Sequence, residues 1–120
     1  MNLTIPFRLP GFNEYSDAER TNRHAAATMK KQTQEQIGWY IVQQLKGVTF
    51  NNPVWLKYTW VEANRKRDKD NISSAQKFIQ DALVKQGVIK NDGWRGVEGF
   101  EHHFEIGEAA KVQIEITEAI

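Results

Sequence analysis

The sequence predicts an α+β domain with a mixed β-sheet and two main helices, and three patterns indicate this fold class. Apolar residues recur every four positions in one long segment, which is the spacing of a buried helix face. In other segments apolar and polar residues alternate, which is typical of strands that bury one side. The predicted order is strand, helix, strand, helix, strand, strand, and this order favours an α+β arrangement.

The first half of the chain is predicted to contain a short strand and the longer helix. The strand spans residues 3–8 and ends before Pro10-Gly11, a pair that favours a turn. Ser16 can cap a helix that continues to Lys46 and stops at Gly47. The inner face of this helix carries Met29, Thr33, Ile37, Ile41 and Leu45. Another face carries Arg20, Arg23, Ala27, Lys30 and Lys31, which form either a phosphate-binding stripe or an ordinary solvated surface.

The second half is predicted to contain three strands and the shorter helix. The clearest strand is 54–62, in which Val54, Leu56, Tyr58 and Trp60 share one side. Asn71 or Ser73 caps the second helix, and Gly87 ends it. The segment Asn91-Asp92-Gly93 has the composition of a turn. The last two strands span residues 98–105 and 111–117, the second with Val112, Ile114 and Ile116 on one face.

Length and composition are those of one globular domain that covers residues 1–120. Hydrophobic residues make up 40% of the chain and aromatic residues 11%, which argues against disorder. The chain has no cysteine, so disulfides and thiolate metal sites are excluded. We see neither a signal peptide nor an apolar run long enough to cross a bilayer. We therefore expect a cytoplasmic protein with no membrane partner.

Charge is distributed unevenly although the net charge is only +1. Residues 64–90 contain seven Lys or Arg against three acids, whereas residues 96–120 contain six Glu and one Lys. A cationic region of this kind can face a polyanion such as DNA. From charge alone, a solvated surface with uneven charge is an equally good interpretation.

Two carboxylates interrupt the most basic stretch of the chain, Arg65-Lys66-Arg67-Asp68-Lys69-Asp70-Asn71. In an extended backbone Asp68 and Asp70 would point the same way, and Lys69 would point the opposite way. Two neighbouring anions repel each other, and a bound cation relieves that repulsion. Their oxygen ligands suit a hard ion such as Mg²⁺ or Mn²⁺. The segment therefore predicts a metal-dependent phosphodiesterase, in which the flanking cations hold a polyanionic substrate.

The same residues resemble a known family. The elements Asp68-x-Asp70-Asn71, Lys77, Asp81-Ala82-Leu83 with Gly87, and Asn91-Asp92 are similar to the core signature of the RusA-type Holliday-junction resolvases. The segment Leu9-Pro10-Gly11-Phe12-Asn13-Glu14-Tyr15 is similar to the family's proline-rich opening. The resemblance covers nearly the whole chain, but only the stretch 68–92 is specific.

The resemblance implies a RusA-like fold and a homodimeric endodeoxyribonuclease that acts on four-way DNA junctions in recombination and repair. It implies that Asp68, Asp70 and Asp92 bind Mg²⁺ or Mn²⁺ and that Lys77 is a further catalytic residue. Hydrolysis would leave a 5′-phosphate. Asp92 would reach the other two acids either within one subunit or across the dimer. The predicted DNA contacts are Arg65, Lys66, Arg67, Lys69 and Asn71.

Two positions depart from the family's pattern. The last motif of the family usually has two acids, whereas Asn91 stands at the first of these positions here. Lys77 follows Asp70 by seven residues, about one helical turn more than the family's spacing. An added turn nearly restores the direction of a side chain, so Lys77 could still face the site from about 5 Å further along the helix.

Other patterns favour different interpretations or are excluded. An EF-hand is excluded because Ser73 and Ile79 occupy the positions that need Gly and Glu. His102 and His103 would face opposite sides of a strand, so a structural role is favoured over metal binding. No nucleotide-binding glycine loop is present, so no nucleotide cofactor is expected. A branched-DNA-binding module without activity, a nuclease for flaps or other branched DNA, and a protein-interaction domain remain alternatives.

Overall fold

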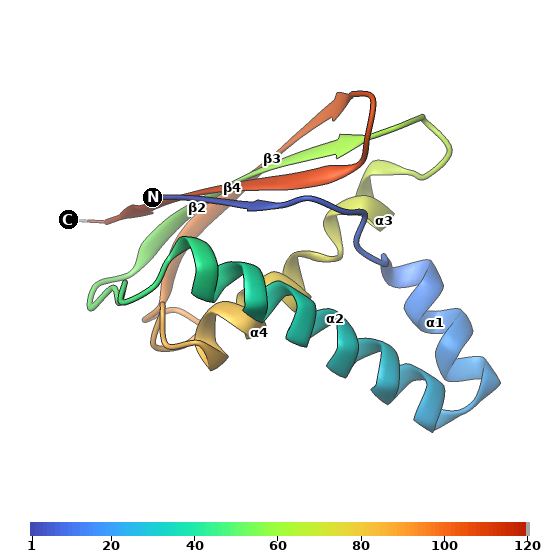
Figure 1. Cartoon of the computed structure of the whole chain (residues 1–120), viewed down its shortest axis with the longest axis horizontal. Coiled ribbons are helices and arrows are strands. Elements are labelled where there is room, and N and C mark those ends of the chain that lie inside the picture. The colour runs from blue at the N-terminus through green and yellow to red at the C-terminus, as the bar shows by residue number, and fades with distance from the viewer. Residues whose placement is uncertain (120) are drawn as a thin grey trace.

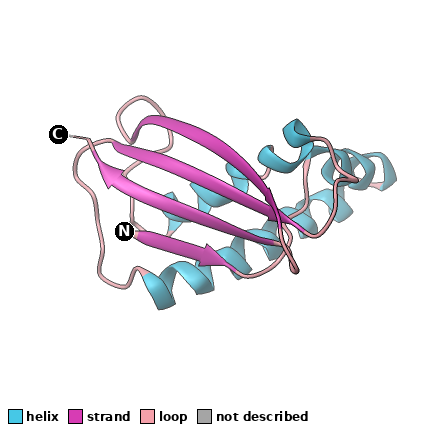
Figure 2. Cartoon of the chain, turned by 90° about the horizontal axis from the view of Figure 1, so that it is seen from above, coloured by secondary structure: helices cyan, strands magenta, loops and turns pink. Residues whose placement is uncertain are grey.

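A mixed four-stranded sheet forms one layer of the protein, and the helices lie on one face of it (Figure 1, Figure 2). The computed structural model describes residues 1–119. Its elements are β1 (Asn2–Ile5), α1 (Phe12–Thr21), α2 (Arg23–Gln44), β2 (Val54–Glu62), α3 (Lys69–Ser73), α4 (Gln76–Lys85), β3 (Val97–Ile106) and β4 (Lys111–Glu118). The strand order is β1-β4-β2-β3, with β2 and β3 parallel and the other pairs antiparallel. The predicted α+β fold with a mixed sheet is confirmed.

The strands follow the predicted alternation of apolar and polar residues. In β2, Trp55 and Lys57 are exposed between buried neighbours, because successive side chains leave opposite faces of a sheet. In β4 the buried residues are Val112, Ile114 and Ile116, as expected. The first strand ends at Ile5 rather than at Arg8. Pro6 explains the early end, because proline has no N–H to donate to the strand ladder.

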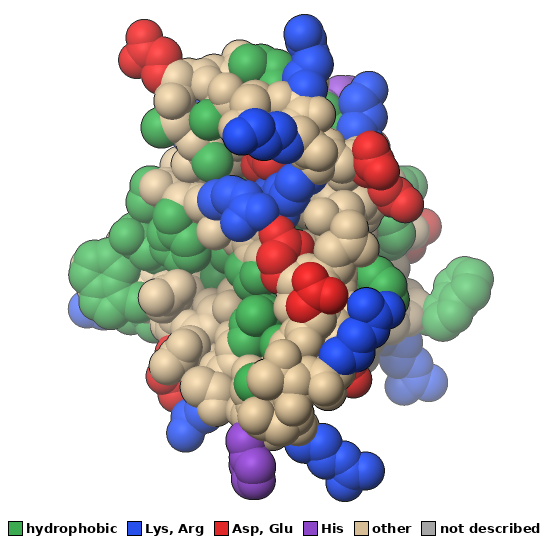
Figure 3. Space-filling model, turned by 90° about the vertical axis from the view of Figure 1, so that its right-hand side faces the viewer, with side chains coloured by type: hydrophobic (Ala, Val, Ile, Leu, Met, Phe, Trp, Pro, Cys, Tyr) green, Lys and Arg blue, Asp and Glu red, His purple; other side chains and the backbone are tan. Residues whose placement is uncertain are grey.

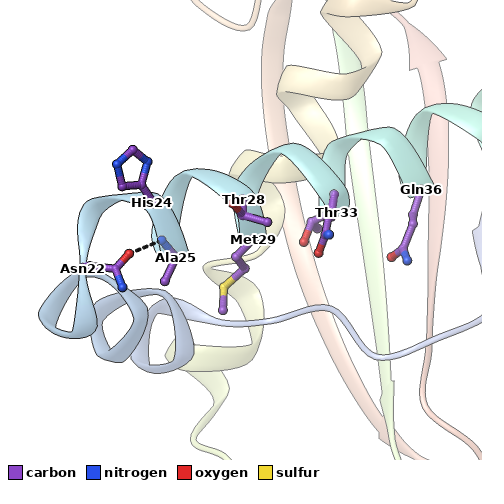
Figure 4. Close-up of a pocket in the computed structure, with 8 residues that line it drawn as sticks. Asn22, His24, Ala25, Thr28, Met29, Thr33 and Gln36 are labelled. Carbon is purple, nitrogen blue, oxygen red and sulfur yellow. Dashed lines mark hydrogen bonds between the residues drawn. The ribbon is translucent and has the colours of Figure 1, made fainter.

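The long helix predicted between Ser16 and Lys46 is two helices, α1 and α2. The break is at Asn22, whose φ of −174° and ψ of 162° are extended. Its side-chain Oδ1 accepts a hydrogen bond from the amide of Ala25 at 2.6 Å (Figure 4). This bond caps the N-terminus of α2. The predicted basic stripe is divided as a result, because Arg20 lies in α1 and the other members lie in α2.

The second predicted helix is also interrupted, into the short α3 and the longer α4. Asp68 precedes α3, in place of the predicted caps Asn71 and Ser73, which both lie inside that helix. Gly87 ends the helical region as predicted, and its φ of 76° is a conformation that favours glycine. The predicted turn at 91–93 is present, with the amide of Gly93 donating to the Asn91 side chain at 3.0 Å.

The hydrophobic core lies between the sheet and helices α2 and α4. The predicted inner face of α2 is buried at Thr33, Ile37, Ile41 and Leu45, whereas Met29 is half-buried. The largest fully buried side chains include Trp60 and Tyr58 from β2, Ile37 and Ile41 from α2, and Ile79 and Leu83 from α4. Among the helices of residues 1–119, none is both long enough and apolar enough to cross a membrane.

The N-terminus of α1 is attached to α3 mainly through backbone groups. The amide of Asn13 donates to Asn71 Oδ1 at 2.9 Å, and the amide of Phe12 donates to Ser74 Oγ at 2.7 Å. The backbones approach so closely that a Cβ on Gly11 would lie 2.3 Å from the carbonyl oxygen of Asn71. No residue of α1 itself is fully buried. The first turn therefore anchors this helix.

Replacement of Gly11 tests this attachment. Gly11→Ala is expected to lower the free energy of unfolding by about 1–3 kcal/mol, because the added Cβ would overlap the Asn71 backbone. Urea unfolding followed by circular dichroism measures the change. Gly93→Ala is the matched control, since its Cβ would meet only Asn91 Oδ1, at 3.5 Å, and should change stability by less than about 0.5 kcal/mol. Wild-type stability in Gly11→Ala would contradict the close approach.

Candidate metal and DNA-binding site

The loop that joins β2 to α3 is folded around a buried ion pair. Arg67 donates from Nε and Nη2 to the two carboxylate oxygens of Glu62, at 3.0 and 2.9 Å. Its Nη1 donates to the carbonyl of Leu9 at 3.0 Å and lies 3.5 Å from the Glu14 carboxylate. The side chains of Arg67 and Glu62 are only 11% and 12% exposed. The guanidinium of Arg67 therefore bonds to groups inside the fold and is not placed for the predicted contact with DNA.

Glu14 completes this cluster from α1. Burial alone would raise the pKa of the Glu14 carboxyl, but hydrogen bonds from backbone amides, including that of Gly11, and the charges of Arg8 and Arg67 bring it below its usual value. The carboxylate therefore stays ionised at neutral pH and favours the cationic form of its partners. The cluster joins the end of the sheet to the N-terminal segment and α1.

A cleft of about 430 Å³ opens beside this loop. One side is formed by the end of β3, through Phe104, Glu105 and Ile106. The other side is formed by Glu62, Asn64, Arg65, Arg67, Asp68, Lys69 and Ile72. The apolar side chains of Ile72, Phe104 and Ile106 and the charged side chains around them give the cleft both apolar and ionic surface. Phe104 and Ile106 are site residues that the sequence analysis missed.

Asp68 and Asp70 are exposed beside the cleft, at the start of α3. The expected extended arrangement is wrong, because α3 begins at Lys69 and Asp70 lies in its first turn. The side chain of Asp68 makes no capping bond to the helix. Asp70 accepts one hydrogen bond on Oδ1, from the amide of Asn71 at 2.9 Å. Both carboxylates therefore keep oxygen atoms that could bind a hard cation.

Three of the five predicted DNA contacts are exposed cations, and the other two are internal. Arg65, Lys66 and Lys69 are exposed and form no ion pair within residues 1–119. Lys69 Nζ lies 5.6 Å from the ring centroid of Phe104 instead of facing away from the cleft. Asn71 is 8% exposed and holds the N-terminus of α1, so it is not placed for the predicted contact with DNA.

Lys77 lies between two carboxylates on α4 and the following loop. Its Nζ is 2.5 Å from Asp92 Oδ2 and 2.9 Å from Asp81 Oδ1. These hydrogen bonds, the one to Asp92 first, raise the pKa of Lys77, and the same bond from Lys77 lowers the pKa of Asp92. Asp81 also accepts a hydrogen bond from Gln34 of α2 at 3.2 Å and so links α4 to α2. The structure thus brings together Lys77 and Asp92, two of the four predicted catalytic residues.

The two halves of the predicted site are not joined within one chain. Asp68 lines the cleft beside the end of β3, whereas Asp92 is bonded to Lys77 at the start of α4. In the described part of the chain, no three His, Asp or Glu side chains are grouped so that they could hold one metal ion. One subunit therefore supplies a pair of carboxylates at Asp68 and Asp70 and a separate lysine–carboxylate pair at Lys77 and Asp92.

The end of the molecule that carries α1 and α3 has a mixed charge pattern. Lys and Arg side chains gather beside acidic side chains near the middle of this face (Figure 3). The exposed residues of the loop and of α3, Arg65, Lys66, Asp68, Lys69 and Asp70, contribute both signs of charge. Cations beside carboxylates can hold a phosphate near a metal ion that the carboxylates bind.

A chain of polar side chains runs between the sheet and α4. Trp60 Nε1 donates to His102 Nδ1 at 2.9 Å, so Nε2 of the neutral ring carries the proton and donates to Gln76 Oε1 at 2.9 Å. Gln76 in turn donates to Gln80 Oε1, which also accepts from the Tyr58 hydroxyl at 3.1 Å. Burial lowers the pKa of His102, and the neighbouring His103 adds to this effect. The structural role predicted for His102 agrees with these contacts.

The protonation of His102 gives a testable dependence of stability on pH. Its pKa in the folded chain lies below the unfolded value of about 6.5, so between the two values the unfolded chain binds more protons. The stabilisation is therefore present above about pH 6.5 and is lost as the pH falls through the folded pKa. Urea unfolding at about pH 7 and about pH 5 should show a decrease that is smaller in His102→Gln. His103→Gln should keep most of the decrease, because burial is the larger cause of the lowered pKa of His102. The same decrease in His102→Gln and wild type would contradict this explanation.

Comparison with known proteins does not add a relative. No protein-family model matches the sequence, and no curated protein matches it. A functional assignment therefore depends on the side chains described above and on the resemblance of their spacing to the resolvase signature.

Proposed function

We propose that this chain is a metal-dependent endodeoxyribonuclease of the RusA type that resolves four-way (Holliday) DNA junctions by paired phosphodiester hydrolysis. One observation carries the proposal. Asp68 and Asp70 keep carboxylate oxygens available beside a cleft whose rim holds the exposed cations Arg65 and Lys69. Carboxylate pairs bind hard divalent ions, and nearby cations bind phosphates. The combination suits hydrolysis of a nucleic-acid backbone.

The donor set fits Mg²⁺ or Mn²⁺ better than a softer metal. The proposed ligands are the carboxylates of Asp68, Asp70 and Asp92, and the chain has no cysteine to offer a thiolate. A bound divalent ion would lower the pKa of a water ligand and offset charge on the phosphate. The protein's own part is to hold the carboxylates close to the loop that binds the DNA.

Lys77 and the exposed loop cations supply positive charge. The raised pKa of Lys77 keeps its ammonium group protonated at neutral pH, so it can donate to phosphate or leaving-group oxygen. Arg65, Lys66 and Lys69 would hold backbone phosphates and make DNA binding dependent on salt concentration. Arg67 acts indirectly, because its bonds to Glu62 and Leu9 fix the loop that presents Asp68.

The proposed metal site requires a second subunit. Asp92 is held by Lys77 and does not join Asp68 and Asp70 in one chain. In a homodimer, the partner's Asp92 would complete each three-carboxylate site. A twofold dimer then carries two equivalent sites, which matches the approximate twofold symmetry of a four-way junction.

The separation of the acids also favours a second candidate. Because residues 1–119 of one chain contain no three-carboxylate group, the chain would be a branched-DNA-binding module without activity if the acids stay apart in the assembly. Both candidates use Arg65, Lys66 and Lys69 to bind DNA. They differ in whether strand scission depends on a divalent ion.

Asp70→Asn separates cleavage from binding. The variant should fold and bind a labelled four-way junction as the wild type does, because Asp70 makes only one local hydrogen bond. Nicking with Mg²⁺ or Mn²⁺ should fall by more than about 100-fold, since even residues that only orient metal ligands contribute about 10–100-fold. A gel assay with junction, flap and linear duplex, each with metal or chelator, gives the comparison. Full nicking by Asp70→Asn would refute the metal assignment. Faster cleavage of the flap than of the four-way junction would indicate a nuclease for flaps instead.

Mixing two inactive variants tests whether the site is shared between subunits. Asp70→Asn and Asp92→Asn should each be inactive alone. If Asp92 acts on the partner, half of the randomly mixed dimers are heterodimers with one intact site of two, so nicking should return to about a quarter of the wild-type level. Sites confined to one chain would give no recovery. Activity in Asp92→Asn alone would remove Asp92 from the site.

A further inference from the structure

The outer edge of β3 is the longest free backbone edge of the sheet. β3 has ten residues, Val97–Ile106, stands last in the strand order and is paired only with β2. Figure 2 shows the strand at the border of the sheet with no further strand beside it. None of its residues is fully buried. Its outward N–H and C=O groups form a row that another strand can pair with.

β3 has only part of the usual protection of an edge strand. Glu98, Glu101 and Glu105 are charged and the register against β2 shifts between Val97 and Gly99, but the strand contains neither proline nor lysine, and its pairing is regular from Gly99 onward. At the opposite border, β1 has only four residues and is followed at once by Pro6, so that edge is short and blocked. The edge of β1 is therefore protected against pairing with another strand, whereas the edge of β3 is open to it.

We propose that the outer edge of β3 is a dimerisation surface, on which a second copy of this chain pairs antiparallel about a twofold axis at His102. Antiparallel pairing of two identical edges is self-complementary and closes at two copies. It would join two four-stranded sheets into one sheet with the helices of both copies on the same side. This surface would build the homodimer of the proposed function, but its basis is the strand edge and not the nuclease chemistry.

The alternation along β3 limits the possible registers. His102 faces the helices, because it bonds to Gln76 of α4, and Phe100 and Phe104 share its side of the strand. Glu101 and His103 lie on the opposite face, where they contact each other at 3.0 Å. A twofold axis perpendicular to the sheet keeps these faces matched. Residues directly opposite must therefore both be even-numbered or both be odd-numbered.

Charge selects one of the remaining registers. With the axis at His102, Glu101 lies opposite the partner's His103, and Phe100 lies opposite the partner's Phe104, each twice by symmetry. With the axis at Glu101, the two copies of Glu101 face each other. With the axis at His103, Glu101 faces the partner's Glu105. Like charges directly opposite destabilise a strand pair, whereas aromatic pairs stabilise it, and a histidine ring can donate a hydrogen bond to the carboxylate opposite it. Registers centred on Phe100 or Phe104 also avoid like charges, but they would pair only residues 97–103 or 102–106 of the strand. The register centred on His102 pairs residues 98–106 and is therefore favoured.

Apolar exposure on β3 supports the same surface. Phe100 and Ile106 are 53% and 51% exposed; in the proposed register Phe100 lies two residues from the axis and Ile106 at one end of the pairing. In the favoured register, Phe100 would pack beside the partner's Phe104. Burial of these groups would add a hydrophobic contribution to the backbone hydrogen bonds of the paired edges.

The test measures oligomeric state with neither DNA nor metal present, so its result is independent of nuclease activity. Light scattering after size-exclusion chromatography should give twice the 13.9 kDa chain mass for the wild type. His103→Glu would place a second carboxylate opposite the partner's Glu101 and should raise the dissociation constant about tenfold or more. Glu101→Lys removes the carboxylate that would face the partner's His103 and should also weaken the dimer. Circular dichroism checks that both variants are folded.

Mixing the two variants decides the register. In a heterodimer of Glu101→Lys with His103→Glu, lysine lies opposite glutamate at one contact and the native pair remains at the other, so a tight dimer should reappear. Trp94→Ala is the control, because Trp94 is 98% exposed and lies outside β3, and it should dimerise as the wild type does. A monomeric wild type, unchanged dimers in both variants, or no recovery on mixing would each overturn the proposal.

Discussion

The bonds of Arg67 are the interaction on which the geometry of the proposed site depends. One guanidinium connects the last residue of β2, the carbonyl of Leu9 and the carboxylate of Glu14. Because this group is nearly buried, loss of any partner would leave charge without compensation in a poorly solvated place. The loop between Arg67 and α3 is therefore fixed at the end of the sheet, and Asp68 and Asp70 are presented beside the cleft rather than on a free loop. Asn71 extends the same connection to the start of α1.

Much of the fold could be predicted because hydrophobic periodicity reports burial directly. The alternation in β2 and β4 and the four-residue spacing on α2 match the buried residues of the structure. The interruptions of the two helices were missed, since the helical pattern continues across them. Asn22 is a good N-cap, but a cap in the middle of a long polar and basic segment gives no change in periodicity. Pro6 was a usable signal for the end of β1 that the predicted strand overran.

The candidate site could be predicted only in part, because residue type is visible in a sequence and partners are not. Lys77 and Asp92 lie together, but within residues 1–119 Asp68 and Asp70 do not form a three-carboxylate group with Asp92. Arg67 and Asn71 have the residue types of DNA contacts, but the fold uses both to hold its N-terminal segment. Their partners in the N-terminal segment, the Leu9 carbonyl and the Asn13 amide, lie 58 residues away in each case, so no local pattern could reveal these contacts. Phe104 and Ile106 enter the cleft through the parallel pairing of β3 with β2, which is also a long-range feature.

The shallow attachment of α1 has a consequence for how this protein can diverge. The helix has no fully buried residue and is held by its first turn, largely through backbone amides. Backbone contacts do not depend on the identity of the side chains that follow them. The exposed positions of α1, such as Asp17, Glu19 and Arg20, are therefore free to drift in evolution, whereas Glu14 and the residues that contact α2 are constrained. Homologous chains can change the surface at this end of the molecule while they keep one scaffold.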